Sequence, residues 1–209
     1  FNIDIEGSIN KDKTAVLRVF AKMFYNHLGF FGENLKVAML EQYIDQLGKT
    51  EEFRRVFEEK KGKSWVDQRK AFAFNGKFII PTLMEVLDMG EDDAKRWFND
   101  KTAVDFSIAR LVEDIKTYVN KKPSDFRLLF MIDEVGQYVG TDTDMLLNLQ
   151  SLTEKIGSEC GGKVWVMCTG QEAIDEIIKV RADEFSRIQA RFKTRLSLSS
   201  SSVDEVIQK

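Results

Sequence analysis

The stretch Leu128-Leu129-Phe130-Met131-Ile132-Asp133-Glu134 decides the predicted fold. Five consecutive apolar residues are typical of a short strand that is buried on both faces, as strands of parallel sheets are. Two adjacent carboxylates, Asp133 and Glu134, end the run. Because open α/β sheets bind ligands at the carboxyl edge of their strands, we expect these charges to be used for binding or chemistry.

The pattern of this stretch matches the Walker B strand of P-loop NTPases. On that interpretation Asp133 helps to hold Mg²⁺, directly or through water, and Glu134 orients and polarises the water that attacks the γ-phosphate of ATP. The alternative is a core strand that runs into an acidic turn and binds nothing. The stretch alone leaves both interpretations open.

Composition narrows the class of protein. The 209 residues include 31 basic and 34 acidic side chains, so no overall basic bias points to nucleic acid. Cys160 and Cys168 are not spaced as CxxC, and we expect reduced thiols in a cytoplasmic protein. The sequence has no apolar run of about 18 residues and no signal peptide, so no membrane association is expected. Both ends look cut from a longer protein.

Three regions are predicted along the chain. Residues 1–33 hold a core strand, Phe1–Ile5, and a following helix in which His27 is a packing residue and not a metal ligand. Residues 34–120 are predicted to form a helical insertion or sub-domain, in which Pro81 lies near a helix start. Residues 121–209 form the ATPase core with the Walker B strand, a sensor and an arginine-finger region.

The last region predicts a strand, a helix and a second strand in succession. The helix is expected over about 144–160, and the second strand at Val164-Trp165-Val166-Met167-Cys168. Such a unit is right-handed with parallel strands. A helix over about 182–191 and a third core strand over 194–198 follow. The predicted fold is therefore α/β: a partial P-loop NTPase core, AAA+-like, with a parallel sheet and a large helical insertion.

Further site residues are expected near the ends of these elements. Thr169, at the tip of the second strand, is the candidate sensor of the γ-phosphate, with Gln171 as a second candidate for binding nucleotide; the alternative for Thr169 is a helix cap. Arg191 is the preferred arginine finger, ahead of Arg187 and Arg195, and the alternative is an ordinary charged helix end.

The sequence has no phosphate-binding loop of the form GxxxxGK[ST]. Gly48-Lys49-Thr50 and Gly62-Lys63-Ser64 lack the upstream glycine, where Tyr43 and Phe57 stand, and neither follows a buried strand. Either the protein is a degenerate relative that does not bind nucleotide, or the loop precedes Phe1 in the parent protein. The order of elements favours the second explanation, so no nucleotide or metal is expected on this fragment alone.

Taken together, these residues resemble the large P-loop ATPase of BREX phage-resistance systems, the BrxC/PglY family. The resemblance rests on FNIDIEGSINKDK, RLLFMIDEVGQYVG, MLLNLQ, GGKVWVMCTGQEAID and RIQARFKTRLSLSSSSVDEVIQK. It implies a bacterial ATPase that uses ATP and Mg²⁺ in its full-length form, assembles with other BREX proteins and with copies of itself, and drives assembly or remodelling on DNA. Contact with DNA is expected to be indirect. The departure from the family is the absent phosphate loop.

Two other functions stay open. The first is a non-catalytic interaction module that docks partner proteins through the helical block. The second is an initiator-like DNA-binding protein, for which the basic residues of Lys60-Lys61-Gly62-Lys63 and Arg69-Lys70 are the local support. Hydrolysis of ATP by the full-length protein would distinguish the ATPase from the interaction module. A steep salt dependence of binding to duplex DNA would indicate the DNA-binding protein.

Overall fold

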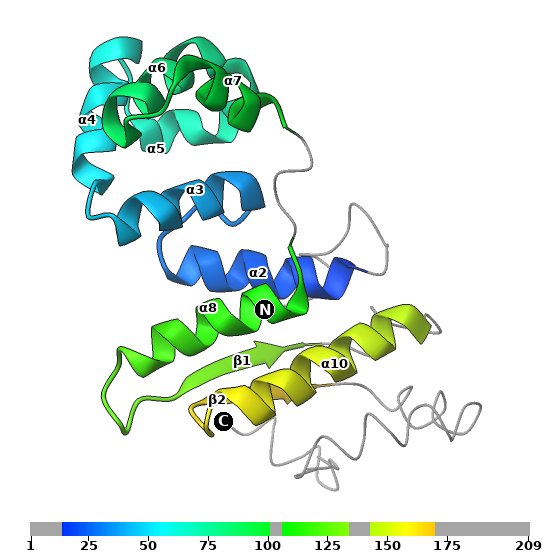
Figure 1. The fold of residues 1–209 in the computed structure, drawn as a ribbon. Helices are drawn as coiled ribbons and strands as arrows, with labels where there is room; N and C mark the ends of the chain where they lie inside the picture. The colour runs from blue at the N-terminus through cyan, green and yellow to red at the C-terminus, as the bar shows by residue number, and fades with distance from the viewer. Residues whose placement is uncertain (1–13, 101–105, 134–142, 170–209) are drawn as a thin grey trace, which may run out of the picture.

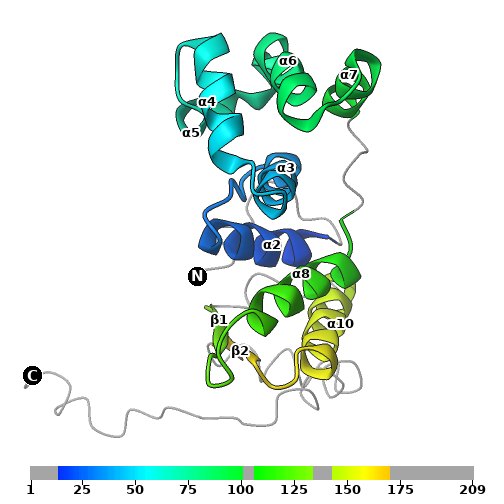
Figure 2. The same ribbon diagram turned by 60° about the vertical axis from the view of Figure 1, so that its left-hand side comes forward.

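The computed structural model describes residues 14–100, 106–133 and 143–169. Figure 1 and Figure 2 show these residues as a stack of helices above a small sheet. The described chain is mostly helical and has one two-stranded parallel sheet, which gives it an α/β character. No helix in these ranges is long and apolar enough to cross a membrane.

The sheet pairs β1 (Leu128–Ile132) with β2 (Val164–Cys168) in parallel. The two strands are joined through α10 (Thr143–Glu159), as the sequence pattern predicts. Leu128 pairs with Val164 and Ile132 with Cys168, so the two strands end at the same level. Asp133 and Thr169, the residues that directly follow the two strands, therefore lie at the same edge of the sheet.

Helices cover one face of this sheet. They are α2 (Ala15–His27), α8 (Ile108–Asn120) and α10, and they share one hydrophobic core with the strands (Figure 1). Phe130 and Ile132 of β1 point into this core, where the Phe130 ring lies 5.2 Å from the ring of Phe20. Burial alternates along β1, so this strand is not covered on both faces by the described residues, in contrast to the expectation from its unbroken apolar run.

A second core lies in the helical block. Its elements are α3 (Leu35–Gln46), α4 (Thr50–Lys61), α5 (Trp65–Gln68), the 3₁₀ helix η1 (Arg69–Phe74), α6 (Gly76–Leu87) and α7 (Glu91–Asn99). Trp65 is at its centre, with the rings of Phe53 and Phe57 edge-on at 5.0 and 5.1 Å. The described part of the block contains no strand, as predicted. The helix α8, within the predicted block limits of 34–120, packs in the other core.

The position of Pro81 differs from the prediction. The sequence places it near a helix start, but it lies inside α6, which begins at Gly76. Proline lacks the N–H that would bond to the carbonyl of residue i−4, here Lys77, and its ring crowds that carbonyl. The apolar side chains Ile79, Leu83 and Val86 of α6 are fully buried, so tertiary packing outweighs this local penalty.

The two cores meet at α3 and at the loop 28–34 before it (Figure 2). Ala38 of α3 faces the sheet-side core, whereas Val37 and Ile44 face the block. The loop passes close to α2 at Gly32, where an added Cβ would lie 2.3 Å from the carbonyl oxygen of Lys22. Only glycine fits such a close backbone approach, so the chain between the cores is held tightly.

Candidate functional site

Asp133 and Thr169 end neighbouring strands and lie side by side at the carboxyl edge of the sheet. The Thr169 N–H donates to the carbonyl oxygen of Ile132 at 2.9 Å, which extends the ladder by one residue. The Thr169 hydroxyl donates to Oδ1 of Asp133. The candidate sensor and the candidate metal ligand, 36 residues apart in the sequence, are therefore in direct contact.

This pair is accessible and polar, while the residues just before it are buried. Asp133 and Thr169 are both exposed, whereas Ile132 is buried in the core. A carboxylate has about four lone-pair sites, and one hydroxyl bond uses a small share of them. The arrangement can therefore present hard oxygen donors to water or to a cation at the end of a parallel sheet, the place where open α/β folds bind ligands.

The thiol next to this pair has a different character. Burial raises the pKa of the Cys168 thiol to about 12, so it stays protonated near neutral pH. Burial also raises the pKa of Cys160, and both cysteines are free thiols in the structure. Since the thiolate is the reactive and metal-binding form, burial disfavours nucleophilic chemistry and soft-metal binding at both residues.

The remaining predicted site residues lie outside the described residues. They are Glu134, Gln171 and Arg191, together with the two other candidate arginines, Arg187 and Arg195. The predicted strand Phe1–Ile5 and the predicted helix and strand over 182–198 lie outside as well. The structure thus brings together one pair, Asp133 and Thr169, and leaves the other assignments as predictions.

The two partial matches to a phosphate loop occupy helix ends. Gly48-Lys49-Thr50 joins α3 to α4, and Lys49 Nζ donates to the carbonyl oxygen of Val86 at 2.5 Å. Gly62 caps α4 in the left-handed conformation, with φ of 72°, and Ser64 caps α5. Neither stretch follows a strand, so neither forms the strand–loop–helix that cradles phosphate.

His27 lies at the end of α2, where its exposed side chain contacts Tyr118 at the surface. Its Nε2 lies 3.1 Å from the hydroxyl of Tyr118, and the two rings meet edge-on with centroids 5.7 Å apart. Within the described ranges no three His, Cys, Asp or Glu side chains gather in a way that could hold a metal ion.

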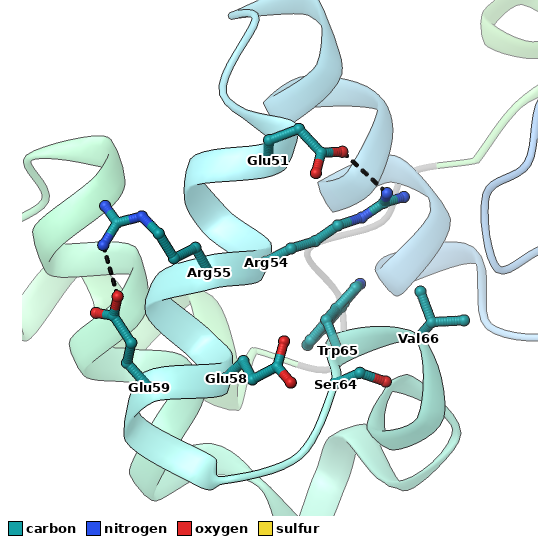
Figure 3. Close-up of a pocket in the computed structure, with 8 residues that line it drawn as sticks. All are labelled: Glu51, Arg54, Arg55, Glu58, Glu59, Ser64, Trp65 and Val66. Carbon is teal, nitrogen blue, oxygen red and sulfur yellow. Dashed lines mark hydrogen bonds and ion pairs between the residues drawn. The ribbon is translucent and has the colours of Figure 1, made fainter.

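A groove on the helical block is a feature that sequence analysis missed. It has a volume of about 440 Å³ and is lined by Glu51, Arg54, Arg55, Glu58, Glu59, Ser64, Trp65 and Val66 (Figure 3). Both of its arginines form ion pairs, Arg54 with Glu51 at 3.1 Å and Arg55 with Glu59 at 2.7 Å. Three glutamates against two arginines leave the groove acidic, which disfavours phosphate or nucleic acid there.

No protein-family model and no solved structure matches this chain. The fold and the contact between Asp133 and Thr169 are therefore the observations on which a functional assignment rests.

Proposed function

We propose that this chain is part of an AAA+-like P-loop ATPase, in which it supplies the metal and water side of the ATP site. The supporting observation is the hydrogen-bonded pair of Asp133 and Thr169 at the ends of adjacent parallel strands. The loop that cradles the phosphates is supplied from outside the sequence printed here, since the sequence contains no GxxxxGK[ST]. Following the sequence resemblance, the parent protein is a BREX phage-defence ATPase that acts together with partner proteins and drives remodelling on DNA.

The oxygen donors of the pair fit Mg²⁺. This ion prefers oxygen ligands, keeps several waters and is commonly bound through one or two carboxylates together with substrate phosphates. Asp133 would hold the ion, and the exposure of its carboxylate leaves room for the waters. When bound, Mg²⁺ supplies positive charge that offsets the developing charge on the phosphates.

The protein groups have separate roles in this proposal. The Thr169 hydroxyl fixes the orientation of the Asp133 carboxylate, and the ladder bond to Ile132 fixes Thr169 itself. Glu134 orients the attacking water, and Gln171 contacts the nucleotide. Arg191 neutralises transition-state charge at the site of a neighbouring subunit.

Hydrolysis by the protein that contains this chain tests the assignment. Glu134→Gln is expected to abolish Mg²⁺-dependent ATP hydrolysis while ATP binding survives, because only water activation is lost. Asp133→Asn should weaken the Mg²⁺ dependence of nucleotide binding. Asp125→Asn, an exposed acid three residues before β1, is the matched control and should change neither. Normal hydrolysis by Glu134→Gln would show that its assignment is wrong.

An interaction module is the second candidate, and one observation favours it. Phe74, at the end of η1, is 87% exposed, an unusual position for a large aromatic side chain. In that case the parent protein lacks hydrolysis altogether, and Phe74→Ser removes binding of a partner protein without loss of stability. Retention of partner binding by Phe74→Ser, together with ATP hydrolysis by the parent, would eliminate this candidate.

A further inference from the structure

Residues 60–78 concentrate positive charge in the helical block. They hold six basic side chains and one acid, Asp67, in a chain whose net charge is −3. Two of the six form ion pairs with acids of the block, Lys60 at 2.6 Å and Arg69 at 3.1 Å. The other four form no ion pair within the part of the chain that the structure describes: Lys61, Lys63, Lys70 and Lys77. The segment therefore keeps a surplus of positive charge that the fold does not use.

Two of these free lysines converge on one aromatic ring. Lys61 Nζ lies 4.5 Å from the ring centroid of Phe78, and Lys77 Nζ lies 4.9 Å from the same centroid. Lys61 is the last residue of α4 and Lys77 the second residue of α6, so the packing of these helices brings the two charges together. A ring face attracts each ammonium group but has no net charge. The pair is therefore not neutralised.

A strongly exposed aromatic side chain lies beside this pair in the chain. Phe74, three residues before Lys77, is 87% exposed. The turn that carries it is fixed by the next residue, because buried Asn75 donates from its side chain to the Gln68 carbonyl oxygen at 3.1 Å. The ring is thus presented to solvent from a turn whose backbone is held in place.

We propose that this surface binds single-stranded nucleic acid. The surface, called the lysine patch below, consists of Lys61, Lys63 and Lys77 with the rings of Phe74 and Phe78. Clustered lysines without acids complement phosphates. An exposed ring can stack on an unpaired base, whereas the bases of a duplex are already stacked on their neighbours. An acidic protein segment would satisfy the lysines but would leave the exposed ring unused.

The acidic groove of Figure 3 shares α4 with the lysine patch but does not neutralise it. Its Glu59 is paired with Arg55, and no ion pair joins its Glu58 to Lys61 among the described contacts. The groove repels phosphate, while the patch attracts it. A bound strand is therefore expected to follow the patch and to avoid the groove.

This inference does not depend on the proposed ATPase function. The family resemblance implies that contact with DNA is indirect, whereas the lysine patch gives the helical block a direct contact of its own. The basic residues that sequence analysis singles out thereby divide into two groups. Lys60 and Arg69 hold the block together, and Lys61 and Lys63 belong to the binding surface.

Fluorescence anisotropy with the full 209-residue chain tests the proposal. The probe is a fluorescein-labelled oligothymidine of about 15 nucleotides. Lys61→Gln with Lys77→Gln should weaken binding about tenfold or more at low salt, and should reduce the slope of log Kd against log salt concentration by about 1.4. Lys95→Gln with Lys121→Gln removes the same charge from exposed sites elsewhere and should change neither. Equal effects of the two double variants would overturn the proposal.

The aromatic contribution has its own test. Phe74→Ala should weaken binding of the same probe about fivefold or more with an unchanged salt slope, because it removes stacking and no charge. Phe74→Trp should restore binding, since indole stacks as well. Full affinity of Phe74→Ala would show that the ring does not contact the strand, and the proposal would fall.

Two competitors distinguish the occupant, and a single variant protects the test against a folding defect. A duplex of the same length should compete at least about tenfold less well than the unlabelled strand, and polyglutamate should not displace it. Equal competition by either would overturn the proposal in favour of duplex DNA or an acidic protein. If the double lysine variant fails to fold, exposed Lys63→Gln alone should still reduce the salt slope by about 0.7. An unchanged slope there would contradict the inference.

Discussion

Asp114 of α8 is buried against α2, and its carboxylate accepts hydrogen bonds from two side chains. The Tyr25 hydroxyl donates to its Oδ2 at 2.8 Å, and Arg110 Nε donates to the same oxygen at 3.3 Å. Burying a carboxylate is costly unless it is paired and hydrogen-bonded. Burial, followed by the charge of Asp114, raises the pKa of Tyr25 above its ordinary value of 10.0. The hydrogen bond between Tyr25 and Asp114 is therefore the polar link between α2 and α8, the helix that precedes β1.

Tyr25→Phe should lower the free energy of unfolding by about 1–3 kcal/mol, because Asp114 loses its neutral donor in a buried position. Urea denaturation at pH 7 measures this. His27→Ala is the control on the same helix, since it breaks an exposed contact with Tyr118, and it should cost less than Tyr25→Phe. An unchanged urea midpoint for Tyr25→Phe would contradict the structural role of the link.

The same pKa shift has a consequence at alkaline pH. Since the folded-state pKa of Tyr25 is raised, the tyrosine of the unfolded chain ionises first, near pH 10. The stabilising contribution is therefore present below about pH 10 and is lost as the pH rises further. Stability of the unmodified chain should fall more steeply above pH 10 than that of Tyr25→Phe, as measured by urea midpoints across the pH range.

At the scale of elements, α6 forms in spite of a local penalty. Pro81 removes one backbone hydrogen bond from the helix interior, yet α6 is continuous from Gly76 to Leu87. Its packing against α4 and α7 buries Ile79, Thr82 and Leu83 completely. The helix is therefore held by its tertiary contacts more than by its intrinsic propensity.

Pro81→Ala should stabilise the helical block. Pro81 is exposed, so alanine leaves no cavity, and it restores an N–H that can bond to the Lys77 carbonyl. A gain of about 1–3 kcal/mol follows from the cost of proline in a helix interior, and thermal unfolding measures it as a higher Tm. Glu85→Ala, one turn later, breaks only an exposed pair with Lys60 and should shift Tm little. A lower Tm for Pro81→Ala would mean that the packing of α6 requires the proline geometry.

At the scale of the whole molecule, Glu41 ties the helical block to the loop that leaves the sheet-side core. Its carboxylate accepts from the Phe31 N–H at 2.6 Å, from Trp65 Nε1 at 2.6 Å and from Arg69 Nη1 at 3.1 Å. These donors come from the loop before α3, from α5 and from η1. One buried carboxylate therefore joins three segments, and the block is expected to move with the loop as one body.

Glu41→Gln should weaken this joint. The amide loses the negative charge and turns an N–H₂ group toward groups that are themselves donors, at a cost of about 1–3 kcal/mol. The expected results are a lower urea midpoint and a changed emission of Trp65. Glu58→Gln, exposed in the groove of Figure 3, is the matched control and should leave both unchanged. Equal midpoints for the two variants would show that Glu41 does not couple the segments.

The strands and several helices could be predicted from local patterns because their signals are strong. The apolar runs at 128–132 and 164–168 became β1 and β2, and the helix expected over about 144–160 became α10. The prediction for Pro81 was wrong because a rule about helix starts cannot weigh the burial of Ile79 and Leu83. The buried network of Glu41 was missed because its donors are spread over 39 positions of sequence, from Phe31 to Arg69.

The amino-acid sequence by itself determined the type and order of the main elements, the absence of a GxxxxGK[ST] loop and the acidic end of the first strand. These properties depend on residues that are close together in the chain. Tertiary structure alone decided that Thr169 touches Asp133, that one sheet face is packed and the other exposed, and that α8 belongs to the sheet-side core. Such features depend on register and on packing between distant segments, which local periodicity does not encode.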